Sequence, residues 1–307
     1  MSPPPVPPRP SSRNSDDWYD GQPIGFGPRV PMTVVSPWTV GGYVDSRLAD
    51  HTSALRFLER WTGVQEPNIS SWRRQVAGDL TSAFDFKHAG KPPTLQQPDS
   101  VPAPIKRWQP NPPADQTIPE QEAGRKDSRR TPYATSVSAR FDDGEIEVSI
   151  SNRGTVAAPY AVYPFAAAET ESKPQHLTIE PGGTKRVSVP VGETWDVVVQ
   201  GPDRFWYEAR GSQSGSAAGV DVTPLIDRHK LRITVGNDAE RTAKVQLISR
   251  AYEGGKRSVK VRAGSEAEVP WPLDHGWFDV EVTCEDDPTF IRRVTGRIDH
   301  PSKPLTA

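Results

Sequence analysis

The chain has 307 residues, enough for two or three domains, but its 33 prolines and hydrophobic content of only 34% argue against one large compact fold. Its net charge is −2 and it has no basic block or stripe, so we expect no nucleic-acid partner. Cys284 is the only cysteine, which excludes an intrachain disulfide and a cysteine-rich zinc site.

The first segment, residues 1–28, is rich in proline and is predicted to be extended coil. It has neither a charged n-region nor an apolar h-region, so no export signal is recognisable, and no later run approaches the roughly 18 apolar residues that cross a bilayer. The segment Val30–Ser36 combines β-branched and apolar residues between prolines, which predicts a buried strand.

A helix is predicted after a glycine-containing loop. Asp50 or Thr52 is placed to cap it, it continues to Trp61, and Gly63 ends it. Four apolar residues fall on one helical face: Ala54, Leu55, Leu58 and Trp61. The predicted strand, loop and helix of residues 29–89 together resemble the last half of a βαβ unit. Such a unit packs against a sheet, and the sequence contains no strands that would form that sheet.

Residues 90–135 contain many prolines and few apolar residues, which predicts a linker or a strap over a neighbouring domain. Beyond this point, apolar and polar residues alternate with a period of two, between turns such as Asp143-Gly144 and Gly182-Gly183. This pattern is typical of antiparallel sandwiches.

The alternating region is an internal repeat, in which GEIEVSISNRG aligns with HKLRITVGNDA, and Trp195 aligns with Trp277. Two tandem β-sandwich domains, residues 136–215 and 220–301, explain the repeat most simply, although one larger sandwich built from both copies remains open. Trp195 and Trp277 are expected in the core, whereas the aromatic run Phe205–Tyr207 is a candidate for exposure.

The motifs SPW, DHTS, EPN, WRR and GDLTSAFDF occur in this order between residues 36 and 86. Together they resemble the C-terminal part of the catalytic domain of bacterial phosphocholine-preferring phospholipases C, in the phosphoesterase family of the alkaline-phosphatase-like superfamily. The β repeat resembles the paired C-terminal domains of the same enzymes. The predicted fold is therefore mixed: the C-terminal remnant of an α/β phosphatase-like domain, followed by two tandem antiparallel β-sandwich domains.

The resemblance implies metal-assisted hydrolysis of a phosphatidylcholine-type phosphodiester, with a divalent metal in the complete family site. The family motifs that supply the nucleophile and most metal ligands have no match here, so we expect this chain alone to bind no metal and to lack most of the catalytic site. Asp50 and His51 are the candidate catalytic residues that remain. For Asp50 the alternative is a helix cap, and for His51 it is a structural hydrogen bond.

Trp72, Arg73 and Arg74 are candidate substrate-binding residues, because arginine forks suit phosphoryl oxygens. The alternative is that these residues clamp a loop onto a helix.

Two functional hypotheses follow. The chain is either part of a phospholipase C, whose partners would be a phospholipid or membrane surface and an upstream catalytic polypeptide, or a non-catalytic β-sandwich binding module derived from one. The family implies export, but the sequence itself leaves the location of this chain open.

Overall fold

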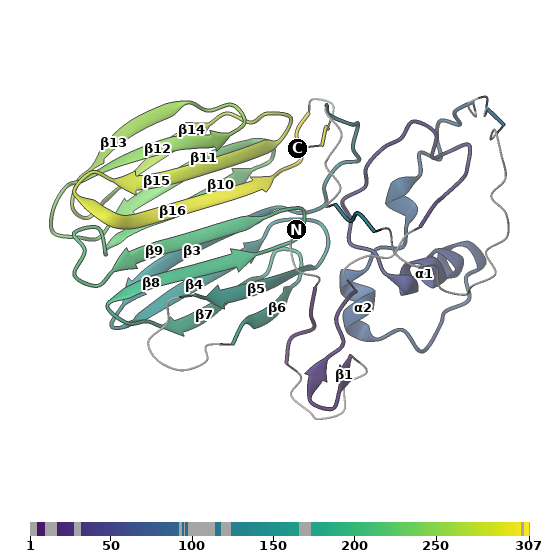
Figure 1. Cartoon of the computed structure of the whole chain (residues 1–307), viewed down its shortest axis with the longest axis horizontal. Coiled ribbons are helices and arrows are strands. Elements are labelled where there is room, and N and C mark those ends of the chain that lie inside the picture. Colours follow the sequence, from purple (N-terminus) through teal and green to yellow (C-terminus); the bar gives the residue numbers. More distant parts are fainter. Residues whose placement is uncertain are drawn as a thin grey trace.

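The computed structural model describes residues 5–9, 17–27, 32–91, 94, 96–97, 114–117, 124–165, 173–301 and 304–306. Two layers of strands form a β body from residue 135 to residue 297, and the helices lie together at one end of it (Figure 1). We call the described residues between 5 and 91 the N-terminal module. None of the helices in the described part of the chain is long or apolar enough to cross a membrane.

The N-terminal module holds two very short strands and two helices. These are β1 (Trp18–Tyr19), β2 (Gln22–Pro23), α1 (His51–Thr62), α2 (Ser71–Val76) and a 3-10 turn at Thr81–Ala83. The strands of the first repeat are β3 (Thr135–Asp142), β4 (Glu145–Asn152), β5 (Ala158–Pro164), β6 (Gln175–Ile179), β7 (Thr184–Pro190), β8 (Thr194–Gln200) and β9 (Trp206–Ser212). Those of the second are β10 (Val220–Asp227), β11 (Lys230–Asn237), β12 (Ala243–Ala251), β13 (Lys256–Val261), β14 (Ser265–Trp271), β15 (Trp277–Cys284) and β16 (Asp287–Arg297).

The two repeats have the same topology and share one sheet. Each contributes a three-stranded sheet, β3-β4-β7 or β10-β11-β14, and four strands to an eight-stranded sheet of order β13-β12-β15-β16-β9-β8-β5-β6. The last strands of the two repeats, β9 and β16, pair antiparallel at its centre (Figure 1). The order of equivalent strands in the eight-stranded sheet is therefore the same when it is followed from either edge. The sequence left open two tandem sandwiches or one larger sandwich, and the structure combines them. Each repeat builds a sandwich, and the sandwiches are fused.

The core lies between the layers because inward positions alternate with outward ones along each strand. In β8 the inward side chains are Trp195, Val197 and Val199, and in β15 they are Phe278, Val280 and Val282. The most enclosed core residues have almost no exposed surface, among them Ile146, Ile150, Leu231, Ile233 and Leu247.

The tryptophan alignment of the repeats is wrong by one residue. Trp195 lies opposite Gly211 and its ring fills the space above that glycine, while Phe278 has the same relation to Gly296. Phe278 is therefore the equivalent of Trp195. Trp277 points to the other face of the sheet, where its indole N–H donates to the Leu305 carbonyl oxygen at 2.8 Å.

Three other expectations also need correction. Residues 32–36 form no strand, and Val35 is 92% exposed, because no neighbouring strand pairs with this segment; residues 30 and 31 lie outside the described part. The aromatic run is not an exposed cluster, since Phe205 and Tyr207 lie in the core. Within the expected coil of residues 1–28, the described residues 18–23 form the β1-β2 hairpin; residues 1–4, 10–16 and 28 are not described.

The predicted helix is confirmed almost to the residue. The Asp50 carboxylate accepts the Thr52 N–H at 2.9 Å, and the Ser53 hydroxyl accepts the Asp50 N–H at 3.0 Å, which completes a capping box. Gly63 ends the helix with φ +76°, a left-handed conformation that glycine adopts without steric cost.

The strap (residues 124–134) ties the N-terminal module to the β body. The Val44 N–H donates to the backbone carbonyl oxygen of Asp127 at 2.9 Å, and the Arg129 N–H donates to the carbonyl oxygen of Val44 at 2.7 Å. On its other side the Ser128 N–H donates to the Pro304 carbonyl oxygen at 2.9 Å. Residues 124–134 thus lie between the two parts, whereas residues 92–93, 95, 98–113 and 118–123 of the predicted linker or strap lie outside the described part.

A buried asparagine follows the same pattern in each repeat. The Asn152 amide donates to the Val156 and Ile179 carbonyl oxygens, both at 2.8 Å, and accepts the Gly154 N–H at 2.9 Å. Asn237 makes the equivalent bonds to Arg241, Val261 and Ala239. Both side chains thus hold the connection that leaves the three-stranded sheet.

Asn152→Ala should lower the free energy of unfolding by about 3 kcal/mol, because it leaves two buried carbonyl oxygens and one N–H without a partner at about 1 kcal/mol or more each. Urea denaturation measures this change. Asn237→Ala is expected to match it, whereas Asn68→Ala, at an exposed asparagine, should change stability by less than about 0.5 kcal/mol. Similar losses from Asn68→Ala and Asn152→Ala would contradict the assignment.

Candidate functional site

Arg73 is the centre of a network of buried charges in the N-terminal module. Its Nε lies 2.9 Å from Asp17 Oδ1, and its Nη1 lies 2.5 Å from Asp50 Oδ2. The third nitrogen, Nη2, donates to the Ile24 carbonyl oxygen at 3.0 Å. The side chains of Asp17 and Asp50 are only 4% and 8% exposed. All three arms of the guanidinium are therefore engaged within the chain.

Asp50 acts as both a helix cap and an ion-pair partner. Its Oδ1 accepts from the Thr52 N–H at 2.9 Å and from the Thr52 hydroxyl at 2.6 Å, while its Oδ2 faces Arg73. Both oxygens thus have intramolecular partners, and a ligand would have to compete with these bonds.

Arg74 forms a two-bond pair with Glu59 across the gap between α2 and α1. The nitrogen–oxygen distances are 3.0 and 2.9 Å. The Arg74 hydrogen bonds and the Glu66 N–H, which donates to Glu59 at 2.6 Å, hold the pKa of the Glu59 carboxyl below its usual range. This pair fixes the loop between the helices onto α1.

Trp72 joins the N-terminal module to the first repeat. Its indole N–H donates to the Thr178 hydroxyl in β6 at 2.9 Å, and its ring meets Phe26 edge-on with the centroids 5.4 Å apart. A groove of about 490 Å³ lies beside this contact and includes Glu180 and Lys185 among its lining residues. Trp72 is therefore positioned as part of an interface.

His51 differs from the other four candidates. It is the first residue of α1 and is exposed, and its side chain has no hydrogen bond or ion pair with any residue in the described part of the chain. Of the five predicted site residues, His51 is thus the one whose side chain stands open to a ligand or a second polypeptide.

The described residues offer no ready-made site for a divalent metal. In the described ranges there is no group of three or more histidine, cysteine, aspartate or glutamate side chains placed to hold an ion. The carboxylates nearest to His51 along the network, those of Asp50 and Asp17, are already paired with Arg73. No step of the chemistry is therefore assigned to a metal held by this chain.

An apolar surface borders His51 and was only partly predicted. Leu55, Leu58 and Trp61 of α1 are 44%, 46% and 77% exposed. On the same helix Phe57 begins a row of contacting rings: Phe57, Phe84 and Phe86 are stacked, and Trp38 meets Phe86 at a tilt, with centroids 5.0–5.9 Å apart. The motif GDLTSAFDF supplied the aromatic signal, but only the fold shows that these rings line up beside α1.

Asp17 and Thr178 were missed, since each is set by a contact between segments far apart in the sequence. Asp17 lies 56 residues from Arg73, and Thr178 lies 106 residues from Trp72. No local pattern marks either residue.

The comparisons relate both parts of the chain to known families. The Phosphoesterase family matches residues 2–65, and the bacterial phospholipase C C-terminal domain matches residues 128–212 and 217–297. The non-hemolytic phospholipase C of Pseudomonas aeruginosa is 35% identical over 305 residues, covering 92% of this chain and 43% of that protein. The non-hemolytic phospholipase C of Burkholderia pseudomallei is 34% identical over 302 residues, covering 90% of this chain and 42% of that protein.

The hemolytic phospholipase C of Pseudomonas aeruginosa is 29% identical over 323 residues, covering 91% of this chain and 44% of that protein. The chain thus spans less than half the length of these relatives.

Arg73→Ala should loosen the N-terminal module, because it leaves two nearly buried carboxylates without their cation, at a local cost of about 3–5 kcal/mol. We expect faster hydrogen exchange in α2 and at the start of α1, with the β body unchanged. Arg73→Lys should rescue only part of the protection, since one ammonium cannot satisfy three separate acceptors. Arg60→Ala, at a side chain that is 72% exposed, is the control; equal exchange in Arg60→Ala and Arg73→Ala would refute the network.

Proposed function

Because the chain belongs to the bacterial phospholipase C family, we propose that it takes part in phospholipase C hydrolysis of phosphatidylcholine-type lipids in an exported enzyme. In this proposal its β body would be the C-terminal region of such an enzyme, and its N-terminal module would belong to the phosphoesterase domain, which the family matches at residues 128–297 and 2–65 support. The nucleophile and any divalent metal would be held by phosphoesterase residues that the relatives contain outside the matched 43% of their length.

The exposed apolar face of α1 carries this proposal. A surface helix normally turns its apolar stripe toward a core, but here Leu58 and Trp61 are 46% and 77% exposed. Contiguous apolar surface of this kind marks a place where another polypeptide packs. The row of contacting rings that begins at Phe57 on the same helix ends at the exposed side chains of Phe86 and Trp38. The occupant that we propose is the remainder of a phosphoesterase domain.

His51 is the residue of this chain that we propose to act at the completed site. It stands at the start of α1, exposed and without an intrachain partner in the described residues. An imidazole can donate or accept a proton near neutral pH, which suits a reaction in which a phosphodiester oxygen leaves. Asp50 would contribute by capping the helix that presents His51.

A non-catalytic binding module is the second candidate. It is favoured by the intramolecular use of Asp50, Trp72, Arg73 and Arg74, whose polar groups already have partners. In this alternative the β body carries the function, and the α1 face packs against a partner that performs no chemistry.

A complementation assay separates the two candidates. The purified chain, with divalent metals added, should not hydrolyse phosphatidylcholine or p-nitrophenyl phosphorylcholine above background by itself. Adding the phosphoesterase portion of the Pseudomonas aeruginosa non-hemolytic enzyme, expressed without the region that this chain matches, should restore turnover. Failure to restore turnover despite a demonstrated complex would favour the binding module, and turnover by the isolated chain would contradict the proposed division of the site.

Variants of α1 test how the two polypeptides meet. Leu58→Glu with Trp61→Glu should weaken the complex at least about tenfold, because charges would replace buried apolar contacts. Arg60→Glu changes the charge of the same helix at an exposed residue and should leave complex formation intact. His51→Ala should preserve the complex and the melting temperature but lower turnover by about a hundredfold or more, as expected for a general acid or base.

A further inference from the structure

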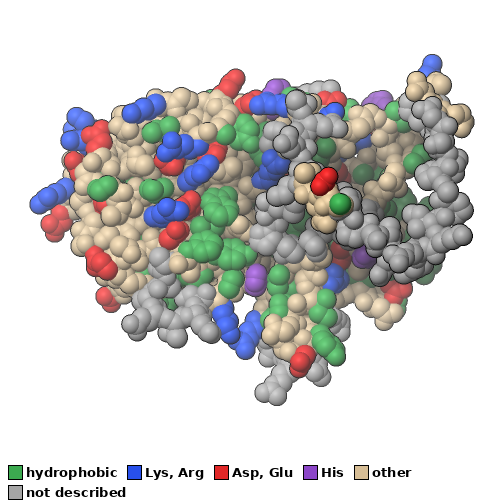
Figure 2. Space-filling view, in the orientation of Figure 1, with side chains coloured by type: hydrophobic (Ala, Val, Ile, Leu, Met, Phe, Trp, Pro, Cys, Tyr) green, Lys and Arg blue, Asp and Glu red, His purple; other side chains and the backbone are tan. Residues whose placement is uncertain are grey.

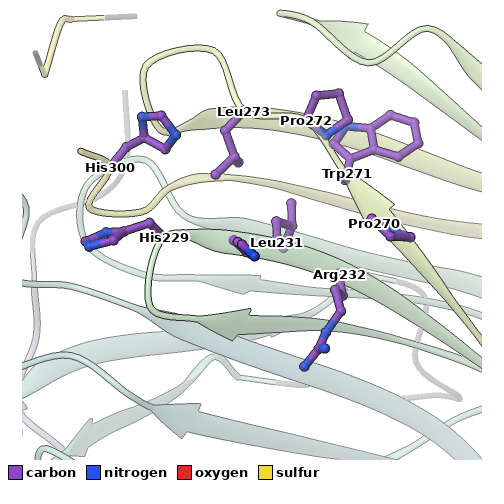
Figure 3. Close-up of a pocket in the computed structure, with 9 residues that line it drawn as sticks. His229, Leu231, Arg232, Pro270, Trp271, Pro272, Leu273 and His300 are labelled. Carbon is purple, nitrogen blue, oxygen red and sulfur yellow. The ribbon is translucent and has the colours of Figure 1, made fainter. Parts of the chain in front are cut away.

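A groove of about 450 Å³ on the second repeat is lined, among the described residues, by basic and apolar side chains. The basic ones are His229, Lys230, Arg232 and His300, and no aspartate or glutamate of the described ranges lines it. Of its two leucines, Leu231 is buried in the core beneath the groove and Leu273 is half-buried. Figure 3 shows both between the two histidines at one end and the proline and tryptophan side chains at the other. The groove therefore combines anion-attracting groups with an apolar wall.

The nearby carboxylates do not cancel this charge. Glu268 lies 3.6 Å from Arg232 Nε, at the edge of ion-pair range and outside hydrogen-bond distance. The Asp299 carboxylate is turned to Arg130, 2.8 Å away. Lys230 is exposed and has no ion-pair partner in the described part of the chain. At least one full positive charge is thus available at the groove.

The same hairpin has the opposite charge in the first repeat. Residues 142–147, DDGEIE, join β3 to β4 and carry four carboxylates, whereas residues 227–232, DRHKLR, join β10 to β11 with three cations against one carboxylate, a net charge of +2 without the histidine. The register of the strands makes Glu145 and Glu147 the equivalents of Lys230 and Arg232. Because the two hairpins share one backbone plan, the fold does not require the cations.

The groove lies at the end of the β body that faces the N-terminal module. His300 follows Asp299, which pairs with Arg130 of the strap, and the strap also bonds to Val44 of the module. In addition, His229 Nδ1 lies 2.9 Å from the Asp299 carbonyl oxygen. This hydrogen bond uses Nδ1 and does not involve Nε2, the other ring nitrogen. A ligand in the groove would therefore be held beside the strap.

We propose that this groove binds the phosphate of an anionic phospholipid headgroup and thereby holds the second repeat against a lipid surface. Lysine and arginine supply the positive charge that attracts phosphate oxygens, and the wall of Pro270, Pro272 and Leu273 suits the glycerol and upper acyl carbons next to the phosphate. A soluble phosphate would use the cations but not the apolar wall. This site is separate from α1, and the proposal does not depend on hydrolysis.

Vesicle co-sedimentation of the full chain tests the proposal. Vesicles of phosphatidylcholine with phosphatidylglycerol should bind the chain, and vesicles of phosphatidylcholine alone should bind it less. Lys230→Gln with Arg232→Gln should weaken binding to the mixed vesicles by roughly thirtyfold, about fivefold for each cation at an anionic surface. The matched control is Lys185→Gln with Arg186→Gln, two exposed cations of β7 in the first repeat, which removes the same total charge.

The control pair should bind as the unaltered chain does, and both double variants should keep its melting temperature because the altered residues lie on the surface. Equal losses in the two double variants would mean general electrostatic attraction and would overturn the groove as a site. Absence of vesicle binding, with inorganic phosphate shifting the His229 and His300 NMR signals, would overturn the lipid assignment in favour of a soluble anion. Absence of both effects would overturn the proposal entirely.

Discussion

The pairing of β9 with β16 is the contact on which the rest of the β body depends. It joins Trp206–Arg210 to Ile291–Thr295 residue by residue and places the two repeats back to back in one sheet. Neither repeat ends in a free sheet edge at this position, so a strand edge that would invite aggregation is covered. The same pairing directs the two equivalent hairpins, acidic in one repeat and basic in the other, to different ends of the body.

Buried polar groups accompany this pairing. Arg292 is 1% exposed, donates to the Arg210 carbonyl oxygen at 2.6 Å and lies over the Phe290 ring. Burial lowers the pKa of Arg292 and raises that of the Asp221 carboxyl, and each is partly offset by the charge of the other. Buried charges of this kind add little net stability. A shifted register of β16 would, however, also remove the Arg292 bond to the Arg210 carbonyl oxygen and leave a further buried group without a partner, so it would be disfavoured.

The sequence predicted elements whose determinants are local and missed those that depend on distant contacts. The helix ends at Asp50 and Gly63 and the Asp143-Gly144 turn were readable, because side-chain caps and positive φ angles are decided within a few residues. The strand predicted at residues 30–36 is absent from the described residues 32–36. Local sequence could not decide this, since β-branched residues form a strand only where a neighbouring strand supplies hydrogen bonds.

The candidate site shows the same division. The residue types at positions 50–51 and 72–74 were recognisable, but their roles depend on Asp17, Glu59 and Thr178, which only the fold brings into contact. An arginine fork that suits phosphate also suits two aspartates, so residue type alone cannot separate a binding site from a scaffold. The structure gives Arg73 two aspartate acceptors within the chain, whereas the His51 side chain has no hydrogen-bond or ion-pair partner in the described residues. A group that acts on a ligand has to be held in place by others that do not, and the capping box at Asp50 holds the start of the helix that carries His51.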